Sequence, residues 1–249
     1  MITKRQQKQS QKTTIKVEEI PVEVHRKDIK NLHVGVYPPD GKVRVSAPLR
    51  LNDEAIRLAI ISRLSWIRRQ QQGFAKQTRE SAREMVTGES HYFQGRRYRL
   101  NVVERQGRAH VRVVNNTMLE LKVKPGTETA GRWRAMERWY RQRLRDQIPG
   151  LLSKWEAVIG VQVSECRIKR MKTRWGSCNI EARRIWLNLE LIKKPTACLE
   201  YILVHEIIHL LERHHTEHFR SLMDQFLPDW RMRRDELNQS PLAHEDWEY

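Results

Sequence analysis

The apolar residues between positions 198 and 211 surround the axis of a predicted helix instead of forming a stripe along one side of it. They are Leu199, Ile202, Leu203, Val204, Ile207, Ile208, Leu210 and Leu211. A helix that is apolar on most of its sides is typical of a helix buried within a domain. The segment therefore predicts a central, buried helix, and any polar residue in it needs a partner that offsets the cost of burial.

A second helix is predicted shortly after this one. Thr216 is a favourable N-cap residue, and apolar residues follow it at the spacing of one helical face. They are Phe219, Leu222, Met223, Phe226 and Leu227. The pattern predicts that the buried helix stops soon after Leu211 and that the chain turns back into a second, amphipathic helix.

Upstream, alternation of apolar and polar residues predicts strands in two regions. From about residue 13 to residue 48 the pattern favours an antiparallel hairpin with its turn at residues 37–41, and a helix follows from Asn52 to about Ala75. From residue 90 to residue 123 it favours a small antiparallel β subdomain. Residues 132–160 are predicted to be helical, with Pro149 as a kink or a restart, and residues 161–188 are predicted to form strands.

Composition narrows the class of protein. The 249 residues are 39% hydrophobic, which is enough for one large domain or two small ones. No apolar run approaches the length of a membrane-spanning helix, so no membrane contact is expected. Residues 1–16 are polar and basic and lack the apolar core of a secretory signal. Three cysteines without a C-x-x-C pair favour reduced thiols, so we expect a cytoplasmic protein.

The chain is strongly basic, with a formal net charge of +17. Such a balance favours acidic partners, so contact with nucleic acid or a nucleotide through a basic surface is a candidate interaction. The basic residues are dispersed along the chain, with some concentration at residues 132–145 and 167–174. A solvated basic surface explains the same composition, and no zinc-finger, helix-turn-helix or RNP pattern favours nucleic acid specifically.

The polar residues of the buried helix form the motif H-E-x-x-H, with His205, Glu206 and His209. Residues four apart lie on one face of a helix, so the two histidines can hold a single metal ion. Glu206 then lies beside the ion, where it can act as a general base toward water. The sequence therefore predicts a metal centre on this helix.

The third ligand must come from outside the motif. Each residue of a straight helix turns by about 100°, so histidines after Leu211 point away from the motif unless the chain turns back. His215 lies in the predicted connection between the two helices, and the turn could deliver it. Glu212 and a more distant acid such as Glu236 remain alternatives. His214 and His218 are interpreted as facing solvent or supporting the ligands, not as ligands themselves.

The spacing His205-Glu206-x-x-His209-x5-His215-x3-Phe219 resembles the YgjP-like metallopeptidase domain, which is often grouped with M48-like and SprT-like zinc proteases. Other segments that resemble this family are Thr173–Cys178, Arg184–Asn188, Pro195 and Pro228–Trp230. The resemblance spans roughly residues 20–238. It implies that His205, His209 and His215 are zinc ligands and that Glu206 is the general base. Glu212 stands where metzincins carry glycine, which argues against a true metzincin.

Together, pattern and resemblance predict an α+β fold, in which a β-rich N-terminal part precedes a compact zincin-like catalytic part with a central HExxH helix. The expected divisions are a disordered basic tail at residues 1–16, a β-rich subdomain with one helix at 17–128, a catalytic subdomain at 129–240 and a tail at 241–249.

The function expected from this combination is that of a zinc-dependent hydrolase, chiefly a metallopeptidase acting on a protein or peptide. Three residues are expected to contact substrate, namely Arg174, Ser177 and Asn188. Cys178 is also expected near the site. One alternative is a metal-dependent nucleoside triphosphate pyrophosphatase. Another is a basic nucleic-acid-associated module whose site is silent or whose zinc is structural, in which case Cys178 or His214 would have to supply the fourth ligand.

Overall fold

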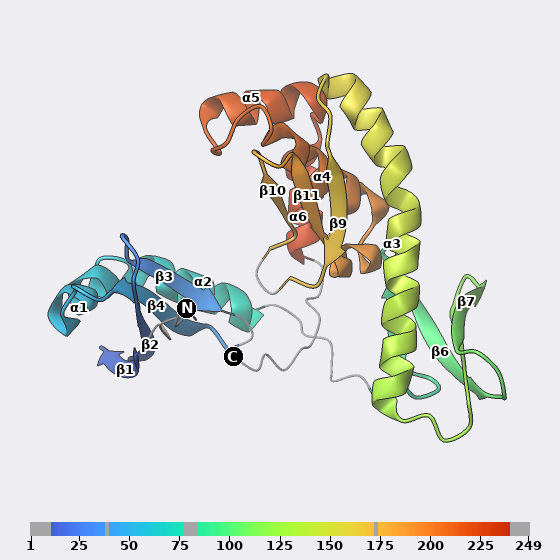
Figure 1. Ribbon diagram of the computed structural model, residues 1–249. Coiled ribbons are helices and arrows are strands. Elements are labelled where there is room, and N and C mark those ends of the chain that lie inside the picture. The colour runs from blue at the N-terminus through green and yellow to red at the C-terminus, as the bar shows by residue number, and fades with distance from the viewer. Residues whose placement is uncertain (1–10, 38–39, 77–83, 172–173, 240–249) are drawn as a thin grey trace, which may run out of the picture. The chain divides into compact units, whose positions relative to one another are not determined.

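The computed structural model describes residues 11–37, 40–76, 84–171 and 174–239. The chain divides into two compact units, which we call the first unit (Met1–Arg79 with Glu245–Tyr249) and the second unit (Glu80–His244) (Figure 1). The expected boundary after residue 128 is therefore replaced by one after residue 79. The fold is mixed α+β, as predicted.

The first unit contains a four-stranded sheet in the order β1-β2-β4-β3. Its strands are β1 (Gln11–Val17), β2 (Ile20–Lys27), β3 (His33–Tyr37) and β4 (Lys42–Pro48). The predicted hairpin is present as the antiparallel pair β3–β4, whereas β2 and β4 pair in parallel. Residues 11–16, expected in a disordered tail, belong to β1, because their backbone pairs with β2 from Gln11↔Arg26 to Val17↔Ile20.

Two helices, α1 (Asp53–Ile61) and α2 (Leu64–Lys76), replace the single helix that was predicted here. Asn52 caps α1 as expected, because its side chain accepts a hydrogen bond from the backbone N–H of Ala55. Ile56, Ile60 and Ile67 pack with the valines of β2 and β4 into a hydrophobic core. All buried members of that core lie between Val17 and Ile67.

The second unit begins with a sheet of the same topology, in the order β5-β6-β8-β7 with β6 and β8 in parallel. Its strands are β5 (Ser90–Phe93), β6 (Arg96–Glu104), β7 (His110–Asn115) and β8 (Met118–Val123). The helix α3 (Thr129–Ile159) follows and continues through Pro149 as one element. The region was expected to be entirely antiparallel, so the parallel pair is a correction.

The remaining elements surround the predicted central helix, α4 (Thr196–Ile208). A three-stranded sheet in the order β10-β11-β9 lies before it in the chain. Its strands are β9 (Glu165–Lys169), β10 (Gly176–Asn179) and β11 (Arg184–Asn188). The short helix η1 (Leu189–Lys193) leads into α4, and α5 (Glu217–Phe226) and α6 (Trp230–Gln239) follow it.

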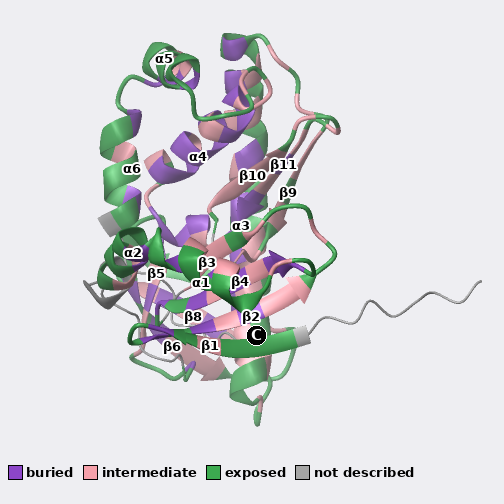
Figure 2. Cartoon of the chain, turned by 90° about the vertical axis from the view of Figure 1, so that its left-hand side faces the viewer, coloured by how far each residue is buried: buried purple, intermediate pink, exposed green. Residues whose placement is uncertain are grey.

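One continuous core explains why the chain does not divide after residue 128. Leu121 of β8, Tyr140 of α3 and Val204 of α4 belong to the same buried cluster. The β5–β6 turn also docks on η1, since Gln94 and Gly95 donate backbone hydrogen bonds to the carbonyls of Ile192 and Lys193 at 2.8 and 3.0 Å. Figure 2 shows α4 as a largely buried helix, as its apolar pattern predicted. None of the described helices has the length and apolar character needed to span a membrane.

Candidate metal centre

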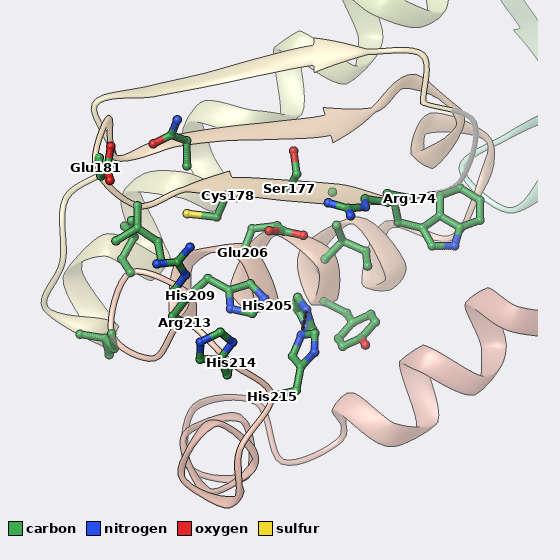
Figure 3. A pocket seen from close by; sticks show the side chains of 18 residues that line it. Arg174, Ser177, Cys178, Glu181, His205, Glu206, His209, Arg213, His214 and His215 are labelled. Carbon is green, nitrogen blue, oxygen red and sulfur yellow. Dashed lines mark hydrogen bonds between the residues drawn. The ribbon is translucent and has the colours of Figure 1, made fainter. Parts of the chain in front are cut away.

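The end of α4 and the start of α5 set the geometry of the site. α4 ends at Ile208 with His209 at its C-cap, so the predicted stop before the later histidines is confirmed. Thr216 then caps α5, with its hydroxyl accepting a hydrogen bond from the backbone N–H of Phe219 at 3.2 Å. The segment between the two helices turns back and returns His215 toward α4 (Figure 3).

Three imidazoles meet at this turn and form what we call the histidine cluster, His205, His209 and His215. Each offers one ring nitrogen, and the three nitrogens all lie within 4.8 Å of one another. The Nε2 atoms of His205 and His215 are 3.0 Å apart. Phe219 packs against all three rings, with centroid distances of 5.0, 4.8 and 4.8 Å. The structure therefore brings together the residues expected to bind the metal.

The two alternative ligands lie elsewhere. Glu212 accepts a hydrogen bond from the backbone N–H of His214 through its side chain, at 3.0 Å. Glu236 lies near Cys198, with its Oε2 atom 3.9 Å from that sulfur. Within the described part of the chain, neither carboxylate joins the group of converging donors.

The donor set fits zinc. Burial, followed by the proximity of His209 and His215, lowers the pKa of His205 to about 3, so its imidazole is neutral and keeps a lone pair available. Burial also lowers the pKa of His209, whose Nδ1 lies 3.1 Å from the carbonyl oxygen of Glu212. A hydrogen bond from Nδ1 leaves Nε2 as the coordinating atom. Three imidazole ligands are a common set for catalytic zinc.

Glu206 is buried beside the histidine cluster, at 5% exposure. Burial raises the pKa of its carboxyl to about 8, against a smaller lowering by Arg174. Figure 3 shows the carboxylate between α4 and β10. Gly176 of β10 makes this position accessible, because a Cβ atom there would lie 2.5 Å from Oε1 of Glu206.

A cavity of about 1100 Å³ opens above these groups, which we call the site cavity. The strand β10, the last turns of α4 and the connection to α5 line it. β10 is an edge strand, paired with β11 on one side and with no other described strand on the other. An extended chain placed in the site cavity could therefore pair with the backbone of β10.

The three residues expected to contact substrate have different positions. Arg174 is exposed and lines the site cavity, close enough to Glu206 to affect its pKa. Ser177 also lines it, but its side chain points away from the histidines (Figure 3). Side chains alternate along a strand, so with Gly176 and Cys178 on the Glu206 side, Ser177 lies on the opposite face. The contact of Ser177 with substrate stays a prediction.

Asn188 does not reach the cavity, which corrects the expectation for this residue. It is 4% exposed, and its side-chain amide donates to the carbonyls of Met171 and Arg174, both at 2.8 Å. It therefore anchors the segment that carries Arg174 instead of contacting substrate. The reason is not local in the sequence, because the last residue of β11 faces the segment between β9 and β10, which lies 14 to 17 residues earlier in the chain.

Cys178 lines the cavity on the same side as Glu206. Burial and then the nearby Glu206 raise the pKa of its thiol to about 11, so it remains protonated near neutral pH. A protonated thiol is a poor zinc ligand. Cys178 also lies outside the group of converging donors among the described residues.

Two further residues of the cavity were not anticipated from the sequence. Tyr201 precedes His205 by one helical turn and stacks on Trp230 with an interplanar angle of 14°. Because Tyr201 and His205 are four residues apart, the sequence could have indicated that they share one face of α4. Arg213 lies in the connection between α4 and α5, where no periodic pattern indicates the direction of a side chain.

Comparison with known proteins finds a family model that matches most of the chain and a solved structure that matches part of it. The family model described as YgjP-like, metallopeptidase domain, matches residues 30–240. No curated protein matches the chain. Among solved structures, the chain is similar to the metallopeptidase zymogen of Pyrococcus abyssi abylysin, at 21% identity and a TM-score of 0.35. That match covers 36% of this chain and 91% of the abylysin chain.

Proposed function

This chain belongs to the YgjP-like metallopeptidase domain family, and from that premise we propose that it is a zinc-dependent peptidase whose metal is held by His205, His209 and His215. The observation that carries the proposal is the convergence of three ring nitrogens within 4.8 Å beside a buried carboxylate. Neutral imidazoles and one acid in a cavity open to solvent are what zinc-assisted hydrolysis requires.

Each residue of the site has a separate role in this proposal. When bound, zinc supplies a Lewis acid that polarises the scissile carbonyl and makes water more acidic near neutral pH. The burial-raised pKa of the Glu206 carboxyl would fall beside the positive charge of bound zinc, so that its ionised form can accept a proton from the attacking water and pass it to the leaving nitrogen. Its burial excludes bulk water from competing for that proton, and Gly176 leaves the space that the carboxylate occupies.

Substrate binding follows from the free edge of β10. An extended peptide adds a strand to this edge, and the backbone of Gly176–Asn179 supplies the hydrogen bonds that hold it. Arg174 lies near Glu206 at the edge of the cavity, where it can orient a substrate carbonyl or stabilise developing negative charge. Asn188 fixes the backbone of Arg174 and so acts as a positioning residue.

The catalytic proposal is tested with full-length protein purified without added metal. We expect about one zinc per chain, and cleavage of denatured casein that a chelator abolishes and added zinc restores. Glu206→Gln should retain the zinc and lower activity by about 10²–10⁴-fold, the usual contribution of a general base. His218→Gln, an exposed histidine outside the histidine cluster, is the control and should change neither property. A Glu206→Gln variant with wild-type activity would exclude this role.

The identity of the third ligand is tested by a second pair of variants. His215→Ala should weaken zinc binding by at least 10-fold, because it removes one of three donors. Glu212→Gln should leave zinc binding within about twofold, because its side chain is bonded to the backbone of His214. Zinc affinity is measured by competition with a fluorescent chelator. The opposite ranking would make Glu212 the ligand.

The same experiments also test two other functions, a nucleoside triphosphate pyrophosphatase and a module with a structural zinc. Arg174 and Arg213 line the site cavity and could contact phosphates, which favours testing a nucleoside triphosphate pyrophosphatase activity beside the peptidase. Nucleoside triphosphates and DNA-crosslinked protein are therefore included in the substrate panel. A purely structural zinc would need a fourth ligand, and among the described residues the cluster offers three.

A further inference from the structure

A second basic and aromatic surface lies on the second unit, away from the histidine cluster. Four arginines of α3 recur at intervals of four, three and four residues, and we call them the arginine stripe. They are Arg134, Arg138, Arg141 and Arg145. At about 100° per residue these positions fall within about 60° of one another around the helix axis, so they form one face. The opposite face, which includes Met136, Tyr140 and Leu144, is buried in the core.

The stripe is available to a partner. Arg134, Arg138 and Arg145 are exposed, and within the described residues they form no salt bridge. Arg141 is held against β9, because its guanidinium donates to the carbonyl of Ile168 at 2.9 Å and to Glu137 at 2.8 Å. A row of positive charge about 16 Å long thus lies along one side of the helix.

The stripe ends at a cavity of about 440 Å³, which we call the α3 cavity. Arg145, Ile148, Pro149 and Leu152 form its helical wall and continue the face that carries the stripe. The opposite wall comes from Cys166, Arg167 and Ile168 of β9 and from Trp186 of β11. The helix face therefore changes from basic to apolar where it meets the aromatic ring.

Trp186 is placed to contact a planar group. It lies on the outer face of its strand, because its neighbours Ile185 and Leu187 are buried on the other face. Arg167 pairs with it in the strand register, and the guanidinium carbon lies 5.4 Å from the centre of the ring. Burial raises the pKa of the Cys166 thiol to about 12, so this thiol stays protonated near neutral pH.

We propose that the arginine stripe and the α3 cavity together bind single-stranded nucleic acid. Arginines contact successive phosphates, and a base enters the cavity and stacks on Trp186 or on the guanidinium of Arg167. The linear order of charges followed by an aromatic cavity fits a single strand, whose bases are available for stacking. A duplex keeps its bases paired, and an acidic protein surface does not present planar rings at regular intervals beside its charges as a nucleic-acid strand does.

This site is separate from the proposed catalytic centre. β9 forms one edge of the three-stranded sheet, β10 forms the other, and β11 lies between them. With neighbouring strands about 4.8 Å apart, the two edges are roughly 10 Å apart. Nucleic acid on α3 would therefore bind at the edge of the sheet opposite the one proposed to bind peptide, and the two ligands would not compete for the same groups.

The test measures binding of a fluorescein-labelled 12-nucleotide oligo(dT) to the full-length protein by fluorescence anisotropy, from 50 to 300 mM KCl. Arg138→Glu with Arg145→Glu should weaken binding by at least 10-fold. It should also make the slope of log K against log salt shallower by about 1.4, which corresponds to two lost phosphate contacts on a single strand. Arg138→Lys with Arg145→Lys should retain most of the affinity and most of the salt slope.

The matched control reverses the same amount of charge elsewhere in the second unit. Arg105→Glu with Arg220→Glu changes two exposed arginines, one in the β6–β7 connection and one on α5, and should leave affinity within about twofold. Equal weakening by the control pair would show that binding follows the overall positive charge, and would overturn the proposal. So would the absence of binding by wild type at 50 mM KCl.

The cavity is tested separately. Trp186→Leu should weaken binding by at least fivefold, because one base–aromatic stack is lost, while the salt slope stays unchanged. A duplex of the same length should bind the wild type more weakly than oligo(dT) and should be insensitive to Trp186→Leu. If the duplex binds as tightly and Trp186→Leu has no effect on either probe, the stacking assignment is wrong. The circular dichroism spectrum of each variant establishes that it is folded.

Discussion

At the scale of single residues, the site depends on the absence of a side chain at Gly176. Gly176 lies in a strand, where glycine is normally unfavourable, yet the position directly faces the carboxylate of Glu206. Any side chain there would push Glu206 away from the histidine cluster. Glycine at this position therefore destabilises the strand, but it leaves the space that the carboxylate of Glu206, the proposed general base, occupies.

We predict that Gly176→Ala lowers kcat for peptide cleavage by at least 10-fold while zinc content is unchanged. The added Cβ would lie 2.5 Å from Oε1 of Glu206, too close for the carboxylate to keep its position. Gly150→Ala in α3 is the control, because a Cβ atom added there would have no other atom within 4 Å. That variant should keep full activity and gain about 0.5–1 kcal/mol of stability. Equal kcat values for the two variants would contradict the assigned role of Gly176.

Individual residues also show where sequence alone stops being sufficient. The motif histidines could be anticipated from helical spacing. The helix stop made His215 one of several candidates for the third ligand, and the family resemblance singled it out. Ser177 could not be oriented, since the direction of a strand side chain depends on which residue first faces the core. Asn188 has the polar character of a binding residue, but long-range folding brings the backbone of Met171 and Arg174 to its amide.

At the scale of elements, α4 is held in place by an ionic network as well as by its apolar sides. Glu200 on α4 accepts hydrogen bonds from Lys154 and Trp155 of α3 at 2.7 and 3.0 Å, and from Arg233 of α6 at 2.6 Å. Burial alone would raise its pKa, but these donors hold the pKa of Glu200 below its usual value. Three helices are thereby connected through one carboxylate.

The network predicts a pH dependence of stability. Because the folded-state pKa of Glu200 is lowered, its stabilisation is present above the ordinary carboxyl pKa of about 4.3 and is lost as pH falls through the folded value. Glu200→Gln should therefore cost about 1–3 kcal/mol at pH 7 and progressively less below pH 4. Urea unfolding of the full-length protein, followed through the transition of the second unit at pH 7 and below pH 4, measures this loss of stability. A cost that does not change with pH would mean that the charge contributes nothing.

Element types were easier to predict than their pairing. Alternating residues located most strands, and the Thr216 cap located α5. The parallel pairs β2–β4 and β6–β8 were missed because local periodicity is the same for parallel and antiparallel strands. The parallel pairs join strands that are not consecutive in the chain, so they depend on contacts between segments that are distant in sequence.

At the scale of the whole molecule, two hydrophobic cores share no residue. One extends from Val17 to Ile67, and the other from Met85 to Leu237. The sequence suggested a boundary at the start of α3, because composition changes there from β-rich to helical. The sheet that precedes α3 instead packs against α3 and η1 and belongs to the same buried cluster as α4, so the actual boundary falls earlier.

Separate cores predict separate unfolding transitions. Ile56→Ala and Val204→Ala each remove a side chain that is fully buried, one in each core. Each should lower the melting temperature of its own unit, with a loss of about 2–5 kcal/mol for the isoleucine variant. Differential scanning calorimetry of the full-length protein follows both transitions. If either substitution moved both transitions equally, the units would be unfolding as one.

The repeated sheet topology carries a consequence for how the chain can change over evolutionary time. The β1–β2 turn at Glu18 and the β5–β6 turn at Gln94 have nearly the same backbone, with φ of 51° and 50°. The second turn is wedged against Pro195 just before the catalytic helix, so drift at Gly95 would disturb the enzyme. Its counterpart at Glu18 forms a salt bridge with Arg68 within the first unit, so a substitution at that turn acts first on contacts of the first unit itself.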